Sequence, residues 1–171
     1  MPAQHTYFGK YRGLVLNNVD PLQKGRLMVQ VPDVSNVLPS TWAMPCLPFA
    51  GIQAGLFVVP DIGSQVWVEF EHGNPDYPIW VGCFWGSSAE VPALALAAPP
   101  ELQQVTIQTL EQNALVISDV PGPTGGILLK ASTGALISIS DTGIVISNGQ
   151  GATIAMTGPT VTINEGALEI V

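Results

Sequence analysis

The sequence predicts an all-β protein built from two modules of different construction. Short segments of alternating apolar and polar residues, separated by turns rich in Gly, Pro and Asn, run along most of the chain. Residues 9–86 hold nearly all the aromatic residues and both cysteines, whereas residues 105–171 hold no aromatic residue. In that second stretch, glycines or glycine-containing turns recur about every eight residues. These observations predict a small barrel followed by a repetitive ladder of strands.

The first module is predicted to contain about five strands in its fewer than ~80 residues. Asp20-Pro21 is a turn pair that ends the first strand. A strand count of this kind suits a five-stranded closed barrel of the OB-fold type, because closure removes the exposed edges of the sheet. The predicted strands are Tyr11–Val19, Arg26–Val31, Gln65–Glu71 and Ile79–Phe84, with a weaker one at Trp42–Leu47.

The second module is predicted to be a ladder of short strands, each with one aliphatic face. Between the glycine turns, pairs of large aliphatic residues alternate with Ser, Thr, Ala, Asn or Glu. The aliphatic positions are Ile127, Leu129, Ile137, Ile139, Ile144, Ile146, Ile154, Met156, Val161, Ile163, Leu168 and Ile170. Left exposed, this stripe would exceed the few hundred Å² of apolar patch that a soluble monomer usually shows.

This aliphatic stripe predicts a homotrimer. After Gln104 the sequence offers no amphipathic helix and no second sheet to cover the stripe, so other copies of the same ladder must do so. We expect an intertwined trimeric β-helix, a triangular prism with the aliphatic side chains inside and backbone hydrogen bonds running between chains. A two-chain sandwich is the alternative, but it would leave strand edges open.

Composition shifts divide the chain into four segments. Residues 1–8 are expected to form an N-terminal arm and residues 9–86 the barrel. Residues 87–104, rich in Pro and Ala, read as a linker. Residues 105–171 form the predicted trimeric needle.

The overall composition excludes several classes of protein. Charged residues make up 11% of the chain and hydrophobic residues 47%, whereas a typical soluble domain has about 25% charged residues. A spanning helix needs roughly 20 continuous apolar residues, and the most apolar stretch, residues 47–60, is interrupted by Gly51, Gln53 and Gly55. The net charge of −8 with five Lys and Arg argues against nucleic acid as a partner. The first ten residues lack the apolar segment of a secretory signal, so none is expected.

No catalytic or cofactor-binding residue is predicted. Asp61, Glu69, Glu71 and Asp76 form the nearest approach to a carboxylate cluster, but the two glutamates occupy outward positions of an alternating strand. Cys46 and Cys83 lie far from each other in sequence and from the two histidines, so no metal site is predicted. We expect two small buried thiols, and spacing does not decide their redox state. Aromatic residues that could form a stacking platform are expected instead to pack in the barrel or against neighbouring subunits: Trp67, Trp80, Phe84 and Trp85.

The first module resembles a known family. The segments GKYRGLVLNNVDPLQKGRLMVQVPDV, WAMPC and VPDIGSQVWVEFEHGNPDYPIWVGCFWG resemble the OB-fold domain of phage baseplate assembly protein V and of the related spikes of type VI secretion and extracellular contractile injection systems. The repetitive C-terminal half resembles the β-helical needle that follows this domain in the same families. The signature positions are Gly63, Val66, Val68, Phe70, Gly73, Pro75, Pro78 and Gly82.

The resemblance implies a structural function. Three barrels would dock on a separate baseplate hub, and the needle would be driven through the target cell envelope when the tail sheath contracts. The particle would assemble in the bacterial cytoplasm and act in a virion baseplate or an extracellular injection particle; the sequence leaves open which of the two. The interval of residues 87–104 is too short for the lysozyme domain that some spikes carry.

The resemblance implies two further expectations for the end of the needle. The needle has no histidine, so the iron-binding His-x-His apex of some short spikes is not expected. Its last residues remain apolar, and a PAAR-like tip protein would contact Leu168, Ile170 and Val171.

Two other functions remain open on the sequence. A trimeric tail fibre that binds a receptor or surface glycan would usually carry an aromatic-rich distal module, which residues 105–171 lack. A peptidoglycan-cleaving spike would need its enzyme on a separate chain.

Overall fold

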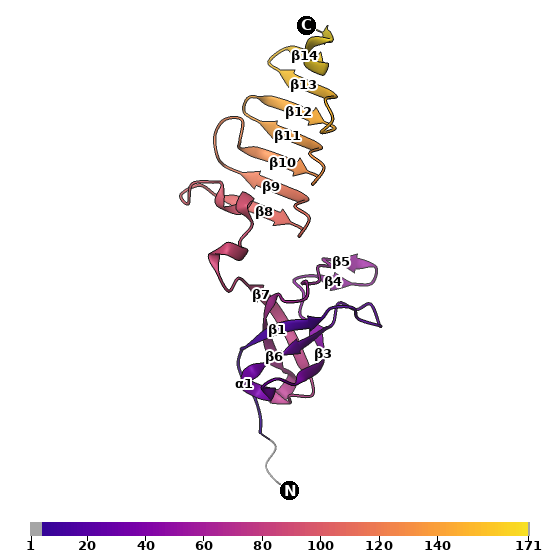
Figure 1. The fold of residues 1–171 in the computed structure, drawn as a ribbon, viewed down its shortest axis with the longest axis vertical. Coiled ribbons are helices and arrows are strands. Elements are labelled where there is room, and N and C mark those ends of the chain that lie inside the picture. The colour runs from indigo at the N-terminus through magenta and orange to yellow at the C-terminus, as the bar shows by residue number, and fades with distance from the viewer. Residues whose placement is uncertain (1–4, 171) are drawn as a thin grey trace. The chain divides into compact units, whose positions relative to one another are not determined.

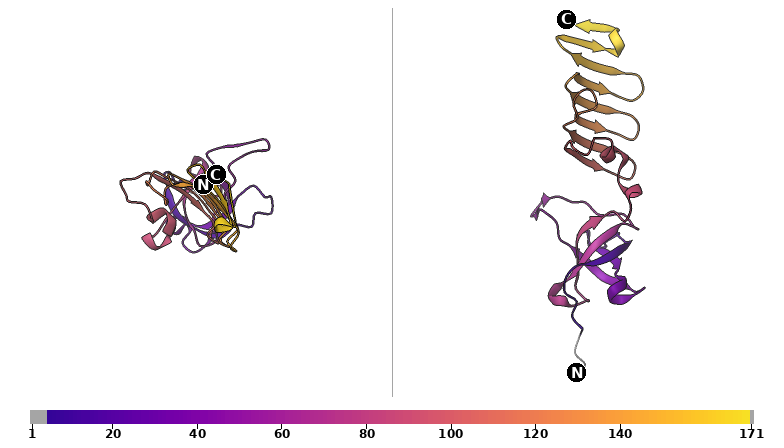
Figure 2. Two further views of the ribbon diagram at one scale, coloured as in Figure 1. Left: turned by 90° about the horizontal axis from the view of Figure 1, so that it is seen from above. Right: turned by 90° about the vertical axis from the view of Figure 1, so that its left-hand side faces the viewer.

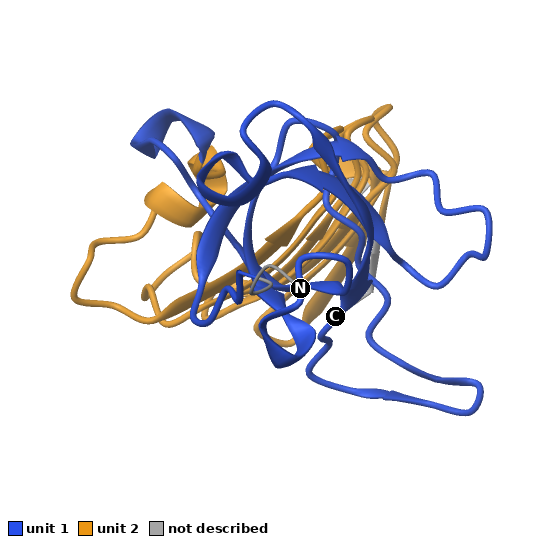
Figure 3. Ribbon diagram, turned by 90° about the horizontal axis from the view of Figure 1, so that it is seen from below, with its two compact units in different colours: residues 1–90 blue, residues 91–171 orange. Residues whose placement is uncertain are grey.

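The computed structural model describes residues 5–170, apart from the side chains of residues 166, 169 and 170. It divides into two compact units, residues 1–90 and residues 91–171 (Figure 3). Both are built of strands joined by turns and short helices, which confirms the predicted all-β class.

The first unit contains a closed barrel of five strands in the order β1-β2-β3-β7-β6, as predicted (Figure 1). Neighbouring strands are antiparallel except β3 and β7, which run parallel. The bounds are β1 Tyr11–Asn17, β2 Leu27–Gln30, β3 Pro39–Pro45, β6 Gln65–Phe70 and β7 Pro78–Phe84. Each predicted strand of the first module therefore corresponds to a barrel strand.

The barrel core follows from the alternation of apolar residues. Leu27 and Val29 on β2, and Val66 and Val68 on β6, are fully buried. β1 approaches β6 closely at Gly13, where a Cβ atom would lie 2.9 Å from Cγ2 of Val68. The remaining core residues are Val15, Val31, Ala43, Phe70 and Trp80.

Three short elements interrupt the barrel. Helix α1 (Pro32–Ser35) follows β2, and the 3₁₀ turn η1 (Glu71–Gly73) joins β6 to β7. Between β3 and β6, strands β4 (Ala50–Gly51) and β5 (Ala54–Gly55) form a small hairpin that projects from the barrel wall in Figure 1. This hairpin was not predicted from the sequence.

The second unit is one antiparallel sheet of eight strands, in the order β15-β14-β13-β12-β11-β10-β9-β8 (Figure 2). The 3₁₀ turn η2 (Ser88–Glu90) ends the first unit, and η3 (Ala93–Leu96) precedes the sheet. A further 3₁₀ turn, η4 (Asn164–Gly166), precedes β15. The strands are β8 Gln104–Gln108, β9 Ala114–Ser118, β10 Gly126–Lys130, β11 Leu136–Ser140, β12 Gly143–Ser147, β13 Thr153–Thr157, β14 Thr160–Ile163 and β15 Leu168–Ile170.

The pairing within this sheet corrects one expectation. Strands that follow one another in sequence are also neighbours in the sheet, so these backbone ladders lie within a single chain. The expectation that hydrogen bonds between these strands run between chains is therefore wrong. Several of the connecting turns, such as those at Gly134 and Gly158, have a glycine at positive φ where the chain reverses direction.

Within residues 5–170, no helix is long and apolar enough to cross a membrane.

Candidate functional site

One face of the eight-stranded sheet carries two continuous columns of large aliphatic residues. The register places Ile127 opposite Ile139, and Leu129 opposite Ile137, and the same pairing continues through the sheet. One column consists of Val105, Ile117, Ile127, Ile139, Ile144, Met156, Val161 and Ile170. The other consists of Ile107, Leu115, Leu129, Ile137, Ile146, Ile154, Ile163 and Leu168. We call these two columns the aliphatic face.

Every residue predicted for the trimer core occupies a register position on this face. The structure adds two strands that the sequence analysis did not name, β8 and β9, and with them Val105, Ile107, Leu115 and Ile117. Their alternation, VTI and LVI, was a usable signal, but no regularly spaced glycine frames it. For the predicted tip contacts, Leu168 is described and exposed. Val171 and the side chain of Ile170 lie outside what the structure describes.

The aliphatic face is only partly covered in the single chain. Ile137, Ile146 and Ile154 in the middle of the sheet keep 37–40% of their surface exposed. A shallow hollow of about 540 Å³ lies on this face, lined among others by Ile107, Leu115, Leu129, Ile137 and Ile146. Burying the remaining 40% of such a side chain is worth about 0.6–1.2 kcal/mol, taking about 1.5–3 kcal/mol for full burial. Summed over the strands of the sheet, this free energy of burial strongly favours association between chains.

The opposite face differs in composition and in coverage. Its central register positions mix small or polar residues with aliphatic ones: Thr106, Val116, Leu128, Ser138, Val145, Ala155 and Thr162. At β9, the opposite face is already buried within the single chain, through Ala114, Val116 and Ser118. η3 contacts β8 there, and the side-chain amide of Gln104 donates a hydrogen bond to the Leu94 carbonyl. The segment before the sheet therefore covers the opposite face at β8 and β9, whereas Val145 on the same face remains 37% exposed.

Glycines at two strand ends lie close to the backbone of the adjacent strand. Gly126 has φ +79°, and a Cβ atom there would lie 2.0 Å from the Ile139 carbonyl oxygen. A Cβ atom on Gly143 would lie 2.2 Å from the Met156 carbonyl oxygen. Both positions therefore require glycine for space as well as for conformation.

Asparagine side chains complete the turns. Asn113 Oδ1 accepts a hydrogen bond from the Ser132 backbone amide, and Asn164 Oδ1 accepts one from the Thr153 amide, each at 3.0 Å. Each bond connects two loops on the same side of the sheet. These side chains satisfy backbone donors that strand pairing leaves free.

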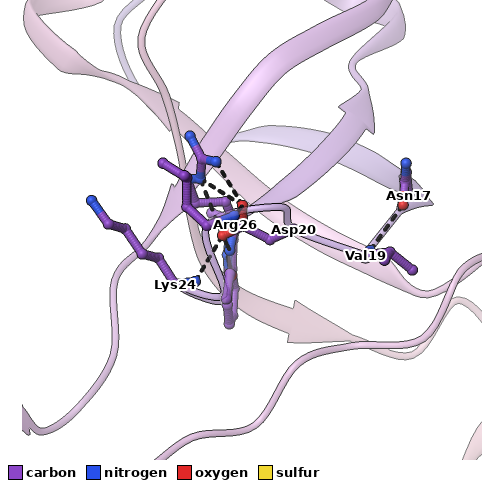
Figure 4. A network of polar contacts seen from close by, with 8 residues as sticks. Asn17, Val19, Asp20, Lys24 and Arg26 are labelled. Carbon is purple, nitrogen blue, oxygen red and sulfur yellow. Dashed lines mark hydrogen bonds and ion pairs between the residues drawn. The ribbon is translucent and has the colours of Figure 1, made fainter.

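An ion pair between Asp20 and Arg26 lies largely buried in the barrel unit (Figure 4). Arg26 Nη2 donates to Asp20 Oδ1 at 2.6 Å, and the backbone amides of Leu22 and Lys24 donate to the same carboxylate. The hydrogen bond from Arg26 is the main reason that the pKa of Asp20 lies well below its usual range. The pair closes the loop between β1 and β2. β1 itself stops short of its predicted end because Asn17 Oδ1 accepts the Val19 amide proton in a turn.

The two matches with known families cover most of the chain. Residues 11–85 match the type VI secretion system/phage-baseplate injector OB domain. Residues 104–169 match the phage baseplate V C-terminal trimerisation domain. The chain belongs to the phage baseplate V family. The search of curated proteins found no match.

In this baseplate V chain, the signature positions of the OB domain have physical roles. Val66, Val68 and Phe70 point into the barrel core, and Pro78 is fully buried at the start of β7. Gly63 and Gly73 have φ of +89° and +73°, a region that glycine occupies without strain. The signature therefore reflects the alternation of β6 and the two turns that flank it.

The aromatic residues of the barrel divide into three environments. Trp80 is buried in the core, and its indole nitrogen donates a hydrogen bond to the Gly25 carbonyl at 3.0 Å. Trp67 and Phe84 pack together on the outer surface with ring centroids 4.6 Å apart, next to the Arg12 guanidinium. Trp85 remains exposed. Packing in the barrel therefore accounts for Trp80 but not for Trp85.

The carboxylates noted in the sequence lie on the surface of the barrel. Glu69 forms an ion pair with Lys10 across the barrel surface. Glu71, Asp76 and Asp61 are exposed. Among the residues that the structure describes, no group of three or more His, Cys, Asp or Glu could hold a metal ion.

The two cysteines correct a second expectation. Cys46 and Cys83 are free and exposed rather than buried, although both line the same pocket of the barrel unit. Partial burial raises the pKa of the Cys83 thiol above its ordinary value. They lie where β3 and β7 leave the barrel, beyond the packed core.

Proposed function

We propose that this chain is the structural central spike of a contractile tail or injection machine. Family membership supports a component of a phage baseplate or a related injection particle. The single observation that supports the trimeric needle is the open aliphatic face, which runs without interruption across the sheet. Both matching families are structural parts of such machines, so we propose no enzymatic activity.

In the proposed assembly, three sheets enclose one axis and turn their aliphatic faces inward. Each sheet supplies its own backbone hydrogen bonds, and the association between chains buries side chains. A large apolar interface of this kind resembles a domain core divided among subunits. The resulting rod resists unfolding because no strand can leave without exposing aliphatic surface from all three chains.

The finer steps are part of the same proposal. The barrels dock on a separate hub protein of the baseplate, and sheath contraction drives the rod through the target cell envelope without bond cleavage. A PAAR-like tip protein covers the distal end, where β15 is the edge strand of the sheet and Leu168 is exposed. We propose assembly in the bacterial cytoplasm, followed by action from the particle.

Light scattering coupled to size-exclusion chromatography tests the central point. The full chain should elute as a single species of three times the 18.0 kDa chain mass over a hundredfold range of concentration. A folded monomer that persists at high concentration would overturn the proposed spike.

A further inference from the structure

The segment between β3 and β6 forms an apolar arm, which we define as residues 47–60. It contains the β4–β5 hairpin and no charged residue. Phe49 and Phe57 are 59% and 67% exposed, and Ile52 in the turn at the apex is 98% exposed. In Figure 1 the hairpin stands away from the barrel strands. Large apolar side chains at such exposure are unusual on a soluble surface unless a partner covers them.

An apolar groove of about 390 Å³ lies at the base of this arm. Its volume falls within the about 300–1,000 Å³ typical of sites that take up apolar ligands. Lining residues include Cys46, Leu56, Val58, Trp80, Val81 and Cys83. No charged residue lines it. The same chain therefore carries an exposed apolar projection and an unfilled apolar recess.

The arm does not fill the groove of its own chain. Leu56 and Val58 of the arm already form part of the groove wall, whereas Ile52 lies beyond β4 and β5 in the two-residue turn. The Leu56 amide donates to the Phe49 carbonyl at 3.0 Å, which fixes the two sides of the hairpin to each other.

We propose that, in the trimer, the apex of each arm inserts into the groove of the neighbouring copy. This inference rests on the proposed function, because the trimerisation domain tethers three copies of the barrel to one another. Tethering raises the effective concentration of arm and groove to about the millimolar range, so a small apolar contact suffices. With one arm and one groove per chain, three head-to-tail contacts close a ring and leave neither surface exposed.

A second copy fits these surfaces better than a different protein does. A foreign partner would have to supply both an apolar recess for each arm and an apolar projection for each groove. The absence of charge on arm and groove also removes the electrostatic steering that usually guides a foreign partner. The contact inside a trimer needs no such guidance.

Disulfide crosslinking tests the proposal, because the groove already contains Cys46 and Cys83. The variant Ile52→Cys places a thiol at the apex of the arm. Mild oxidation of the full-length variant should give covalent trimers on a non-reducing gel, since each apex links to the next groove. The matched control is Leu22→Cys, which replaces an exposed apolar side chain in the loop between β1 and β2 of the same barrel. It should remain monomeric on the gel.

Three other outcomes would overturn the inference. If the Ile52→Cys variant forms no crosslink, or only crosslinks within its own chain, the apex does not reach a neighbouring groove. Covalent dimers that persist after Cys46→Ser and Cys83→Ser would show that the apices meet one another instead. Light scattering on the same samples separates this from the spike proposal: an uncrosslinked trimer rejects only the arm contact, whereas a monomer rejects both.

Alkylation of the native thiols provides a second measurement without an engineered disulfide. In the wild-type trimer the inserted apex should shield Cys46 and Cys83 from iodoacetamide. Ile52→Asp should increase their alkylation rate about tenfold, because a charged apex leaves the apolar groove. Leu22→Asp should leave the rate unchanged. Equal rates in wild type and Ile52→Asp would contradict the insertion.

Discussion

Ile137 on β11 lies directly opposite Ile146 on β12, and both side chains remain about 40% exposed on the aliphatic face. Their cross-strand contact alone cannot bury them, because the sheet has no second layer on that side within the described chain. The pair therefore marks the middle of the surface that sister copies must cover. It is also the best place to test the trimer.

Ile146→Asp should prevent trimer formation. In the proposed prism the three aspartates would meet near one axis, and a buried unpaired charge costs about 3–5 kcal/mol in each copy. Light scattering should show monomers or aggregates instead of trimers. A variant that is trimeric and melts at the wild-type temperature would contradict the assignment of this face.

Val145→Asp is the matched control for this substitution. Val145 is the neighbour of Ile146 in the same strand, is similarly exposed, and occupies the opposite face, where its register partners are Ser138 and Ala155. A carboxylate there stays in water, so the trimer should persist with a change in stability within about 0.5 kcal/mol. If Val145→Asp dissociates the trimer and Ile146→Asp does not, the face that carries Val145 points inward and the proposed orientation of the sheet is wrong.

The barrel could be predicted from sequence because its signals are local. On β6, alternation places Val66 and Val68 inside, and the turns at Gly63 and Gly73 mark where the strand begins and ends. What the sequence could not supply was the hairpin at 47–60. Its strands are too short for a periodic signal, and its apolar residues read as a core segment although the structure exposes them.

For the ladder of strands, the sequence predicted which residues share a face but not which strands pair with one another. Alternation fixes which side chains share a face, and every predicted core residue lies at a matching register position. The alternation of apolar and polar residues does not show whether a neighbouring strand belongs to the same chain or to another copy. The short glycine turns decide this, since a turn such as the one at Gly158 joins β13 directly to β14. The strands at Val105 and Leu115 were not predicted, because no regularly spaced glycine frames them.

Gly126→Ala should destabilise the needle more than an ordinary glycine substitution does. The added methyl group would meet the Ile139 carbonyl oxygen at 2.0 Å, and φ at this position is +79°. The strand end must move to relieve the clash, which disturbs pairing between β10 and β11. We expect a loss of about 2–4 kcal/mol, measured as the shift in thermal unfolding of the trimer.

Gly158→Ala separates the clash from the backbone conformation. Gly158 also has positive φ, at +55°, but nothing lies within 4 Å of its added Cβ atom. Its substitution should cost only about 1–2 kcal/mol, the penalty for a left-handed backbone. Equal losses in the two variants would show that the close approach at Gly126 does not matter.

Trp80→Phe should weaken the barrel. The smaller phenyl ring leaves a cavity in the core, and the Gly25 carbonyl loses the indole donor that lies 3.0 Å away. A buried carbonyl left without a partner costs about 1–3 kcal/mol. Urea unfolding, followed by the fluorescence of the remaining tryptophans, should show this loss. The control Trp85→Phe alters an exposed ring and should change stability by less than about 0.5 kcal/mol.

The pH dependence of barrel stability should reveal the Asp20–Arg26 pair. The folded-state pKa of Asp20 is depressed, mainly by the hydrogen bond from Arg26. The pair therefore contributes its full stability above the unfolded-state pKa of about 3.9, and this contribution declines as pH falls toward the folded-state value. Below pH 4 the carboxylate of Asp20 binds a proton in the unfolded chain but stays ionised in the folded barrel. Lowering the pH therefore favours the unfolded state.

Asp20→Asn tests this linkage because it keeps the size of the side chain and removes its titration. At pH 7 the variant should unfold at lower urea concentration than the wild type, since Arg26 and the amides of Leu22 and Lys24 lose a charged acceptor. The difference should narrow between pH 4 and pH 2 as the wild-type advantage is lost. All tryptophans of the chain lie between residues 42 and 85, so their fluorescence reports the barrel alone. A constant difference between the two proteins across this range would mean that the carboxylate of Asp20 titrates at its ordinary pKa.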